Sequence, residues 1–163
     1  IQAGANLIND IWGFKADEKM AELAARTGVS CCLMHNRNQP DYMDFYRDFI
    51  SDMRECVDLA KKAGVADDKI ILDPGVGFGK THEHNLQIIN HVEILKELGY
   101  PVLLGTSRKS VIGLALDLPS EERLEGTLAT TELGVWKGCG FVRVHDVKEN
   151  KSAISMTKTI MES

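Results

Sequence analysis

Residues 69–85 read KIILDPGVGFGKTHEHN and join a short apolar run to a glycine-rich loop. Positions 70–72 are all apolar, without the alternation of a half-exposed strand. Such runs are typical of strands that helices cover on both faces of a parallel sheet. Asp73 follows at the end of the run, and Pro74 makes the next turn rigid. We therefore predict a strand that ends at a carboxylate, with a loop after it.

The loop resembles a nucleotide phosphate loop, but its spacing excludes that function. The Walker A pattern G-x-x-x-x-G-K-[ST] would end at Gly79, Lys80 and Thr81, and its first glycine would fall on Pro74. Proline has no N–H group to donate to a phosphate. The dinucleotide pattern G-x-G-x-x-G fails as well, because Lys80 stands where the third glycine belongs. We interpret the glycines as room for a ligand to approach, with Phe78 as a wall.

Apolar runs and helical patterns alternate five times along the chain, which predicts an α/β fold with a parallel sheet. We expect strands at 5–11, 29–34, 69–72, 101–104 and 141–144, and helices at 17–27, 43–63, 85–98, 121–136 and 148–161. The stretch 105–123, between the fourth strand and fourth helix, is predicted to be a loop. The chain shows no repeat and no interdomain linker, so residues 1–163 form part of a single domain.

Polar residues follow nearly every predicted strand. They are Asn9-Asp10, Met34-His35-Asn36, Asp73, Thr106 to Ser110, and Arg143 with His145-Asp146. Functional side chains that converge from many strand ends favour a (βα)8 barrel over an open sheet, which concentrates its site at one switch point. Five βα units cannot close a barrel. We therefore expect this chain to supply the last five units of a TIM barrel, with three units preceding Ile1.

The net charge of −5 argues against nucleic acid or an anionic membrane as the main partner, because such surfaces attract basic patches. No stretch of about 18 apolar residues or signal peptide is present, so we expect a cytoplasmic protein. The four cysteines include the adjacent pair Cys31 and Cys32, which fits buried free thiols better than disulfides or a zinc site. His82 and His84 form an H-x-H pair with no third ligand in view.

Five motifs in this order carry a family resemblance: LINDIWG, CLMHN, ILDPGVGFGKTHEHN, LLGTSRKSVIG and VRVHDV. Together they resemble the dihydropteroate synthases, pterin-binding enzymes of folate biosynthesis and targets of the sulfonamides. The resemblance covers essentially the whole chain. It implies a transferase that condenses 6-hydroxymethyl-7,8-dihydropterin pyrophosphate with p-aminobenzoate, giving 7,8-dihydropteroate and pyrophosphate.

The resemblance also implies residue roles. The pterin site would contain Asn9, Met34, Asp73, Gly105 and Lys109. The p-aminobenzoate site would contain Phe78, Lys109 and Ser110. Arg143 and His145 would bind the departing pyrophosphate, and the catalytic residues would be Lys109, Asp73, Arg143 and His145.

The residue types suit that chemistry. Breaking a bond to pyrophosphate builds negative charge on the leaving group, which the planar guanidinium of Arg143 can bind, with His145 donating a hydrogen bond beside it. A carboxylate at position 73 suits two adjacent N–H donors of a heterocycle. Alternatives remain for each residue: Asp73 could only cap its loop, Arg143 could be a structural ion-pair residue, and His145-Asp146 could form a simple strand-end hydrogen bond.

The resemblance further implies Mg²⁺ as a cofactor, with its protein ligand outside this chain, and a homodimer. Without the first loops of the family, we expect the 163-residue chain alone to be inactive and poorly folded. Two rival functions remain open. One is a pterin-binding methyltransferase module that uses methyltetrahydrofolate, which needs no pyrophosphate site. The other is a noncatalytic pterin-binding module, in which Lys109→Ala would leave the biological role intact.

Overall fold

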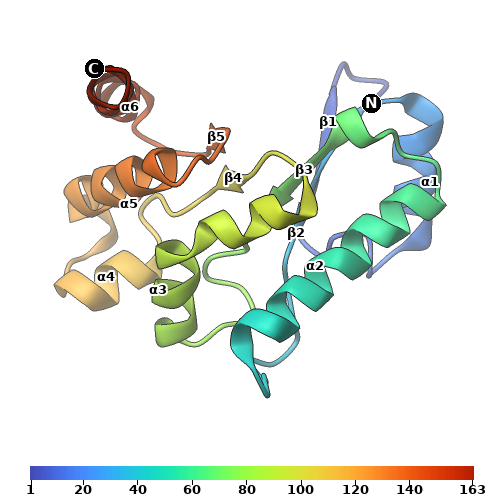
Figure 1. Cartoon of the computed structure of the whole chain (residues 1–163), viewed down its shortest axis with the longest axis horizontal. Helices are drawn as coiled ribbons and strands as arrows, with labels where there is room; N and C mark the ends of the chain where they lie inside the picture. The colour runs from blue at the N-terminus through green and yellow to red at the C-terminus, as the bar shows by residue number, and fades with distance from the viewer.

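The computed structural model describes all 163 residues, and Figure 1 shows strands and helices alternating along the chain. The strands are β1 (Leu7–Asp10), β2 (Ser30–Met34), β3 (Ile70–Asp73), β4 (Leu103–Leu104) and β5 (Phe141–Val142). The α-helices are α1 (Glu18–Thr27), α2 (Phe45–Lys62), α3 (His82–Asn90), α4 (Ser110–Leu116), α5 (Leu124–Trp136) and α6 (Val147–Met161). Three 3₁₀ segments complete the set: η1 (Asp67–Lys69), η2 (Val92–Leu98) and η3 (Ser120–Glu122). The predicted α/β class is confirmed.

All strand pairs are parallel, and neighbours in the sheet are neighbours in the sequence. β1 pairs with β2 and β2 with β3, and β4 pairs with β5. A single parallel bridge between Leu72 and Val102 connects the two groups. The carboxyl ends of all five strands therefore point the same way, so the loops that follow them lie on one side of the fold.

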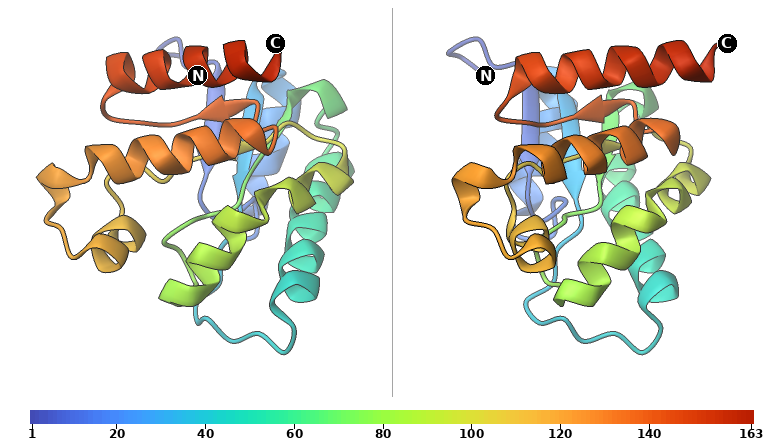
Figure 2. Two further views of the ribbon diagram at one scale, coloured as in Figure 1. Left: turned by 60° about the vertical axis from the view of Figure 1, so that its left-hand side comes forward. Right: turned by 90° about the vertical axis from the view of Figure 1, so that its left-hand side faces the viewer.

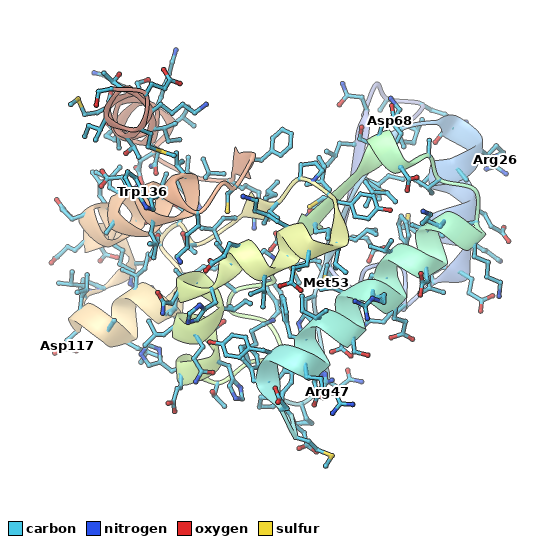
Figure 3. All side chains as sticks on the ribbon, viewed as in Figure 1. Arg26, Arg47, Met53, Asp68, Asp117 and Trp136 are labelled. Atoms are coloured by element: carbon cyan, nitrogen blue, oxygen red, sulfur yellow. The ribbon has the colours of Figure 1, made fainter.

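The two faces of the sheet differ in what they contact. Leu33 and Leu72 point toward the helices and belong to the main hydrophobic core, together with Phe49 and Met53 of α2. Met53 is fully buried, and Figure 3 shows it on the side of α2 that faces η2 and the strands. On the opposite face, Asn9 of the edge strand β1 is exposed, whereas Cys32, Met34 and Asp73 are buried. We call this second surface the inner face.

Local capping explains where the first two helices begin and end. Asp17 accepts a hydrogen bond from the Lys19 N–H group at the start of α1, and Gly28 ends this helix in the left-handed conformation with φ of 66°. Asp44 caps α2 in the same way, and Gly64 follows its end with φ of 94°. The predicted ranges for these two helices are confirmed to within two residues.

Two predictions about the second half of the chain were wrong. The predicted loop 105–123 contains α4, whose Val111 and Ile112 are buried in the core. Seven residues are too few to show a helical repeat of apolar residues. The third helix begins earlier than predicted, at His82, because Thr81 caps it, and it changes to the 3₁₀ segment η2 after His91.

The C-terminal helix α6 packs against α5, and the two views of Figure 2 agree on this arrangement. At the contact, the Thr131 hydroxyl donates to Asn150 Oδ1 at 2.7 Å, and both residues are buried. Elsewhere α6 is largely exposed, including Met156 and Ile160. None of the helices combines the length and hydrophobicity that a membrane-crossing segment requires.

Candidate active site

Residues predicted for the pterin site lie on the inner face near the carboxyl ends of the strands. Asn9 is opposite Cys32, and Met34 is opposite Asp73, so these side chains point to the same side of the sheet. Met34 and Asp73 are almost fully buried, whereas Asn9 is exposed. The structure thus brings Met34 and Asp73 together and places Asn9 on the same face, one strand away.

Asp73 is the last residue of β3 and uses one carboxylate oxygen within the chain. Its Oδ1 accepts the Gly75 N–H at 2.7 Å, and Oδ2 has no hydrogen bond to the chain. Loop capping and ligand binding are therefore compatible, since each uses a different oxygen. Burial raises the pKa of this carboxyl, and the Gly75 N–H and three nearby cations oppose the shift. The cations are Lys109, Arg143 and Lys80.

Lys109 connects the β4 loop to the β3 loop. It immediately precedes α4, its ammonium group donates to the Val76 carbonyl, and Nζ lies 5.0 Å from the centre of the Phe78 ring. A cation at this distance from an aromatic face is attracted to it. Burial lowers the pKa of Lys109, and the Asp73 charge opposes that shift. Lys109 and Phe78, both predicted for the p-aminobenzoate site, therefore lie together beside Asp73.

Arg143 follows β5, and its guanidinium lies across Gly105, the residue that follows β4. A Cβ atom at position 105 would come 3.2 Å from Arg143 Nη2. Arg143 is exposed on the inner face, and none of the ion pairs in the structure includes it. Within residues 1–163 its guanidinium has no carboxylate partner, which favours the predicted anion-binding role over a structural ion pair. Gly105 contributes by leaving space for that guanidinium.

His145 is held by Ser107, a buried residue of the β4 loop. The Ser107 hydroxyl oxygen lies 2.9 Å from His145 Nδ1 and accepts the His145 backbone N–H at 3.2 Å. The Ser107 hydroxyl can donate to Nδ1 or accept from it. When the hydroxyl donates, the ring proton is on Nε2, and His145 presents Nε2–H as a donor.

A second contact joins the same two loops. The Arg108 guanidinium binds the Asp146 carboxylate through Nε and Nη2, with the Nε contact at 3.1 Å. Arg108 has φ of 56°, and Arg123 donates to its carbonyl at 2.9 Å. His145 and Asp146 thus bind the β4 loop, a longer-range connection than the simple strand-end hydrogen bond considered from sequence.

Two of the loop glycines have a different role from the one predicted. A Cβ atom on Gly75 would come 2.0 Å from the His35 carbonyl oxygen, and one on Gly79 would come 2.5 Å from the Arg37 carbonyl oxygen. These glycines accommodate the backbone that follows β2, so the prediction that they make room for a ligand was wrong. Gly77 is more open, with the Lys109 side chain 3.6 Å from its Cβ position.

Ser110 is the first residue of α4 and is exposed. It lines a shallow hollow with residues of the α4–η3 segment, among them Asp117, Leu118 and Arg123. Its neighbour Lys109 points to the Val76 carbonyl, so Ser110 stands at the edge of the group formed by Asp73, Lys109 and Phe78.

Sequence reasoning gave no role to Ser107, Lys80 or His35. Lys80 and His35 were visible only as polar residues beside a glycine-rich loop and a strand end. Their hydrogen bond, 2.8 Å between Lys80 Nζ and His35 Nδ1, joins residues 45 positions apart. Burial lowers the pKa of Lys80 to about 7, and the Asp73 charge opposes the shift.

The chain holds no group of three or more His, Cys, Asp or Glu side chains that could ligate a metal ion. His84 instead stacks on Phe45, with ring centres 4.4 Å apart. All four cysteines are free, and Cys31, Cys32 and Cys56 are buried. These residues therefore offer no complete set of protein ligands for Mg²⁺, which proteins commonly hold through one or two carboxylates together with substrate phosphates and water.

Comparison with known proteins gives matches over nearly the whole chain. Residues 1–145 match the model of the family described as pterin binding enzyme. A dihydropteroate synthase of Clostridium beijerinckii is 62% identical over 99% of this chain and 60% of its own length. The corresponding synthase of Bacillus subtilis is 57% identical over 91% of this chain and 52% of its own length. The chain thus spans between half and two thirds of these relatives.

Solved structures give the same result. The dihydropteroate synthase of Clostridium difficile, solved in the presence of pteroic acid, superposes with a TM-score of 0.95 at 44% identity and covers 98% of this chain and 61% of its own. The Yersinia pestis synthase in a sulfonamide drug complex gives a TM-score of 0.93 at 36% identity, over 99% of this chain and 61% of its own.

Proposed function

The chain belongs to the pterin binding enzyme family, and we propose that it is part of a dihydropteroate synthase. This enzyme condenses 6-hydroxymethyl-7,8-dihydropterin pyrophosphate with p-aminobenzoate and releases pyrophosphate. One observation carries the proposal: a buried carboxylate, Asp73, lies on the inner face with the cations of Lys109 and Arg143 near it. A substrate with a neutral heterocycle and a polyanionic leaving group needs both kinds of group within one site.

At the pterin end, Asp73 Oδ2 accepts N–H groups of the ring. The exposed amide of Asn9 supplies a further hydrogen bond from the neighbouring strand, and Met34 forms an apolar wall. Because Asp73 is buried, little water competes with the ring for its carboxylate. Burial raises the pKa of Asp73, and the Lys109 charge opposes that shift and so favours the ionised carboxylate.

At the leaving-group end, Arg143 and His145 bind the pyrophosphate. The guanidinium lies over Gly105 without a carboxylate partner, so its donors are free for phosphate oxygens. When the Ser107 hydroxyl donates to Nδ1, the His145 ring carries its proton on Nε2 and can donate it to an anion. Both groups stabilise negative charge that grows as the carbon–oxygen bond breaks, which lowers the barrier.

The p-aminobenzoate would lie between the Phe78 ring and the start of α4. Lys109 lies 5.0 Å over this ring, and Ser110 follows it at the helix start. This arrangement would put the amine near the pterin methylene and the carboxylate near Ser110. The position also accounts for sulfonamides as inhibitors, since they share the aniline group. A sulfonamide complex exists for the Yersinia pestis relative.

The fold of the whole protein is proposed to be a (βα)8 barrel in which this chain supplies five consecutive βα units of one domain. Five parallel strands in sequence order, with β1 and β5 paired on one side only, support this proposal. Mg²⁺ is proposed as a cofactor whose ligands lie outside these residues. A homodimer in the cytoplasm completes the proposal, with the exposed apolar residues of α5 and α6 as a candidate contact.

The test uses the full-length protein that contains this chain. Pyrophosphate release that depends on p-aminobenzoate supports the synthase. Binding of methyltetrahydrofolate with methyl transfer to a corrinoid protein, and no pyrophosphate release, would instead support the methyltransferase module. Lys109→Ala should reduce turnover at least about a hundredfold, because Lys109 contacts both substrate sites. An unchanged cellular role in that variant would favour the noncatalytic module.

Residues 1–163 expressed alone should have no synthase activity. Both β1 and β5 present an unpaired edge, and the inner-face residues Leu7 and Phe141 are 38% and 47% exposed. Unpaired edges and exposed apolar side chains promote aggregation. Material with an intact mass of 18.1 kDa that showed full turnover would contradict this expectation.

A further inference from the structure

The Lys80 ammonium group has a full set of hydrogen-bond partners. Its Nζ lies 2.8 Å from His35 Nδ1, 3.1 Å from the Gly75 carbonyl and 3.0 Å from the Phe78 carbonyl. A lysine ammonium has three N–H donors and no acceptor, so three acceptors satisfy it completely. Two of the three belong to the β3 loop, so the cation holds both ends of the segment that includes Val76 and Gly77.

The partner of Lys80 is itself fixed by further contacts. The His35 ring is fully buried, and since Nδ1 accepts from Lys80, Nε2 carries the proton and donates to the Asp52 carboxylate at 2.9 Å. Burial lowers the pKa of His35 to about 4, which keeps the ring neutral at pH 7. The Arg37 guanidinium binds both oxygens of Asp52, with Nη2 3.1 Å from Oδ1 and Nε donating to Oδ2, the oxygen that also accepts from His35. We call Lys80, His35, Asp52 and Arg37 the Lys80 network.

None of the four residues belongs to a strand, and none is among the groups that we assign to the substrates. Asp52 comes from α2, His35 and Arg37 follow β2, and Lys80 ends the β3 loop. The loop between Asp73 and Lys80 carries Phe78 and the Val76 carbonyl that binds Lys109. The network therefore holds the loop that provides these two contacts through hydrogen bonds of Lys80 to the Gly75 and Phe78 carbonyls.

We propose that the Lys80 network positions the β3 loop for substrate binding, with Lys80 and His35 as positioning residues that act through Phe78 and the Val76 carbonyl. This inference rests on the proposed function, because it assigns those loop groups to the substrate site. Without Lys80, the Gly75 and Phe78 carbonyls lose the donor that they share, and no hydrogen bond then keeps the two carbonyls oriented toward one point. Glycines at 75, 77 and 79 would then let the loop take other conformations.

The first test compares Lys80→Met with Lys61→Met in the full-length protein. Lys61 is half exposed and pairs only with Asp67, so this control removes a lysine far from the loop. Hydrogen exchange of the Gly75, Gly77 and Phe78 amides reports on the loop, and the dissociation constant for pteroic acid, measured by calorimetry, reports on the site. Lys80→Met should increase the exchange rates of these amides and the dissociation constant for pteroic acid, each by at least about tenfold. The loss of a hydrogen bond to a charged group has an effect of this size or larger. Lys61→Met should change neither.

Unchanged loop exchange in Lys80→Met would overturn the proposal. So would faster exchange spread evenly over α1, α2 and the loop, because that result describes general loss of stability. Faster loop exchange with unchanged pteroic acid affinity would refute the positioning role.

A second pair of variants separates positioning from packing and remains informative if Lys80→Met does not fold. In His35→Asn, the side-chain oxygen takes the place of Nδ1 and can still accept from Lys80. In His35→Gln, the amide reaches the place of Nε2 and can still donate to Asp52, but Lys80 loses its acceptor. The proposal predicts that Asn retains tighter pteroic acid binding than Gln, by about fivefold or more. If only packing matters, His35→Gln should bind pteroic acid more tightly than His35→Asn, because the smaller Asn side chain leaves the larger cavity.

The outcomes also separate this proposal from the proposed function. If the unmodified full-length protein does not bind pteroic acid, the proposed function fails. If it binds pteroic acid but the two His35 variants rank Gln above Asn, only the positioning role fails.

Discussion

A glycine at position 75 is required for two physical reasons, its left-handed backbone conformation and its close approach to the His35 carbonyl. A comparison of alanine variants at positions 75 and 28 separates the two contributions to stability. Gly75 has φ of 65°, and Gly28, at the end of α1, has φ of 66°. Gly28 has no atom within 4 Å of its Cβ position, whereas a Cβ on Gly75 would come 2.0 Å from the His35 carbonyl oxygen. Alanine at 28 therefore meets backbone strain alone, and alanine at 75 meets strain and a backbone collision.

The expected magnitudes follow from these two terms. A side chain in the left-handed conformation costs roughly 1–2 kcal/mol, which is the whole expected loss for Gly28→Ala. Overpacking adds typically about 1–3 kcal/mol, and the upper end applies at Gly75 because a backbone oxygen cannot rotate away. Gly75→Ala should therefore reduce the free energy of unfolding by about 4–5 kcal/mol. It should also weaken pterin binding, because the Gly75 N–H group orients Asp73 Oδ1.

Urea unfolding of the two full-length variants measures the difference, read as the change in midpoint at constant slope. Binding of pteroic acid to each variant gives the second readout. Equal losses of stability for Gly28→Ala and Gly75→Ala would refute the reasoning, since their φ angles match and only the collision distinguishes them. A stable Gly75→Ala protein with normal affinity would show that the contact with His35 does not set the loop.

Three further predictions concern single groups. Asp73→Asn should weaken pteroic acid binding about tenfold to a hundredfold in calorimetry, because an amide cannot replace a carboxylate as a double acceptor; equal affinity would remove Asp73 from the ring site. Ser107→Ala frees the tautomer of His145, so inhibition by pyrophosphate should weaken several-fold and recover in Ser107→Thr, which restores the hydroxyl; no change in the inhibition constant would exclude this role. Between pH 6.5 and about 4, unfolded His35 binds a proton that folded His35 does not, so stability should decrease by up to about 3 kcal/mol as the pH decreases through this window. His35→Asn should lack that dependence in urea titrations at each pH, and an identical acid profile in the variant would contradict the assignment.

The sequence predicted the elements of the first half well because each carries its own local signal. α1 begins after Asp17 and ends at Gly28, as the capping pattern indicates. α4 was missed because its seven residues are too few to show a helical repeat of apolar residues, and because tertiary contacts stabilise it. Val111 and Ile112 enter the core, and the Arg123 guanidinium lies where a side chain on Gly113 would have to go. Such tertiary contacts cannot be predicted from the pattern of residues within α4.

The candidate site also combines residues that the sequence predicted with contacts that only the structure shows. Asp73, Lys109, Arg143 and His145 were visible in sequence because polar groups after apolar strands are unusual and the motifs are distinctive. Ser107 was also within a motif, yet its bond to His145 spans 38 positions and could not be inferred from spacing.

By itself, the sequence determined the α/β class and the family and predicted the side chains of the candidate site, because strand periodicity, capping residues and motif composition are local properties. Only the tertiary structure decided what those side chains contact. Gly75 and Gly79 proved to accommodate the His35–Arg37 backbone. Lys80 proved to hold the β3 loop through hydrogen bonds to His35 and to the Gly75 and Phe78 carbonyls. The reason is that close approach and hydrogen-bond partners depend on how β2, β3 and α2 pack, and packing joins residues that are far apart in the chain.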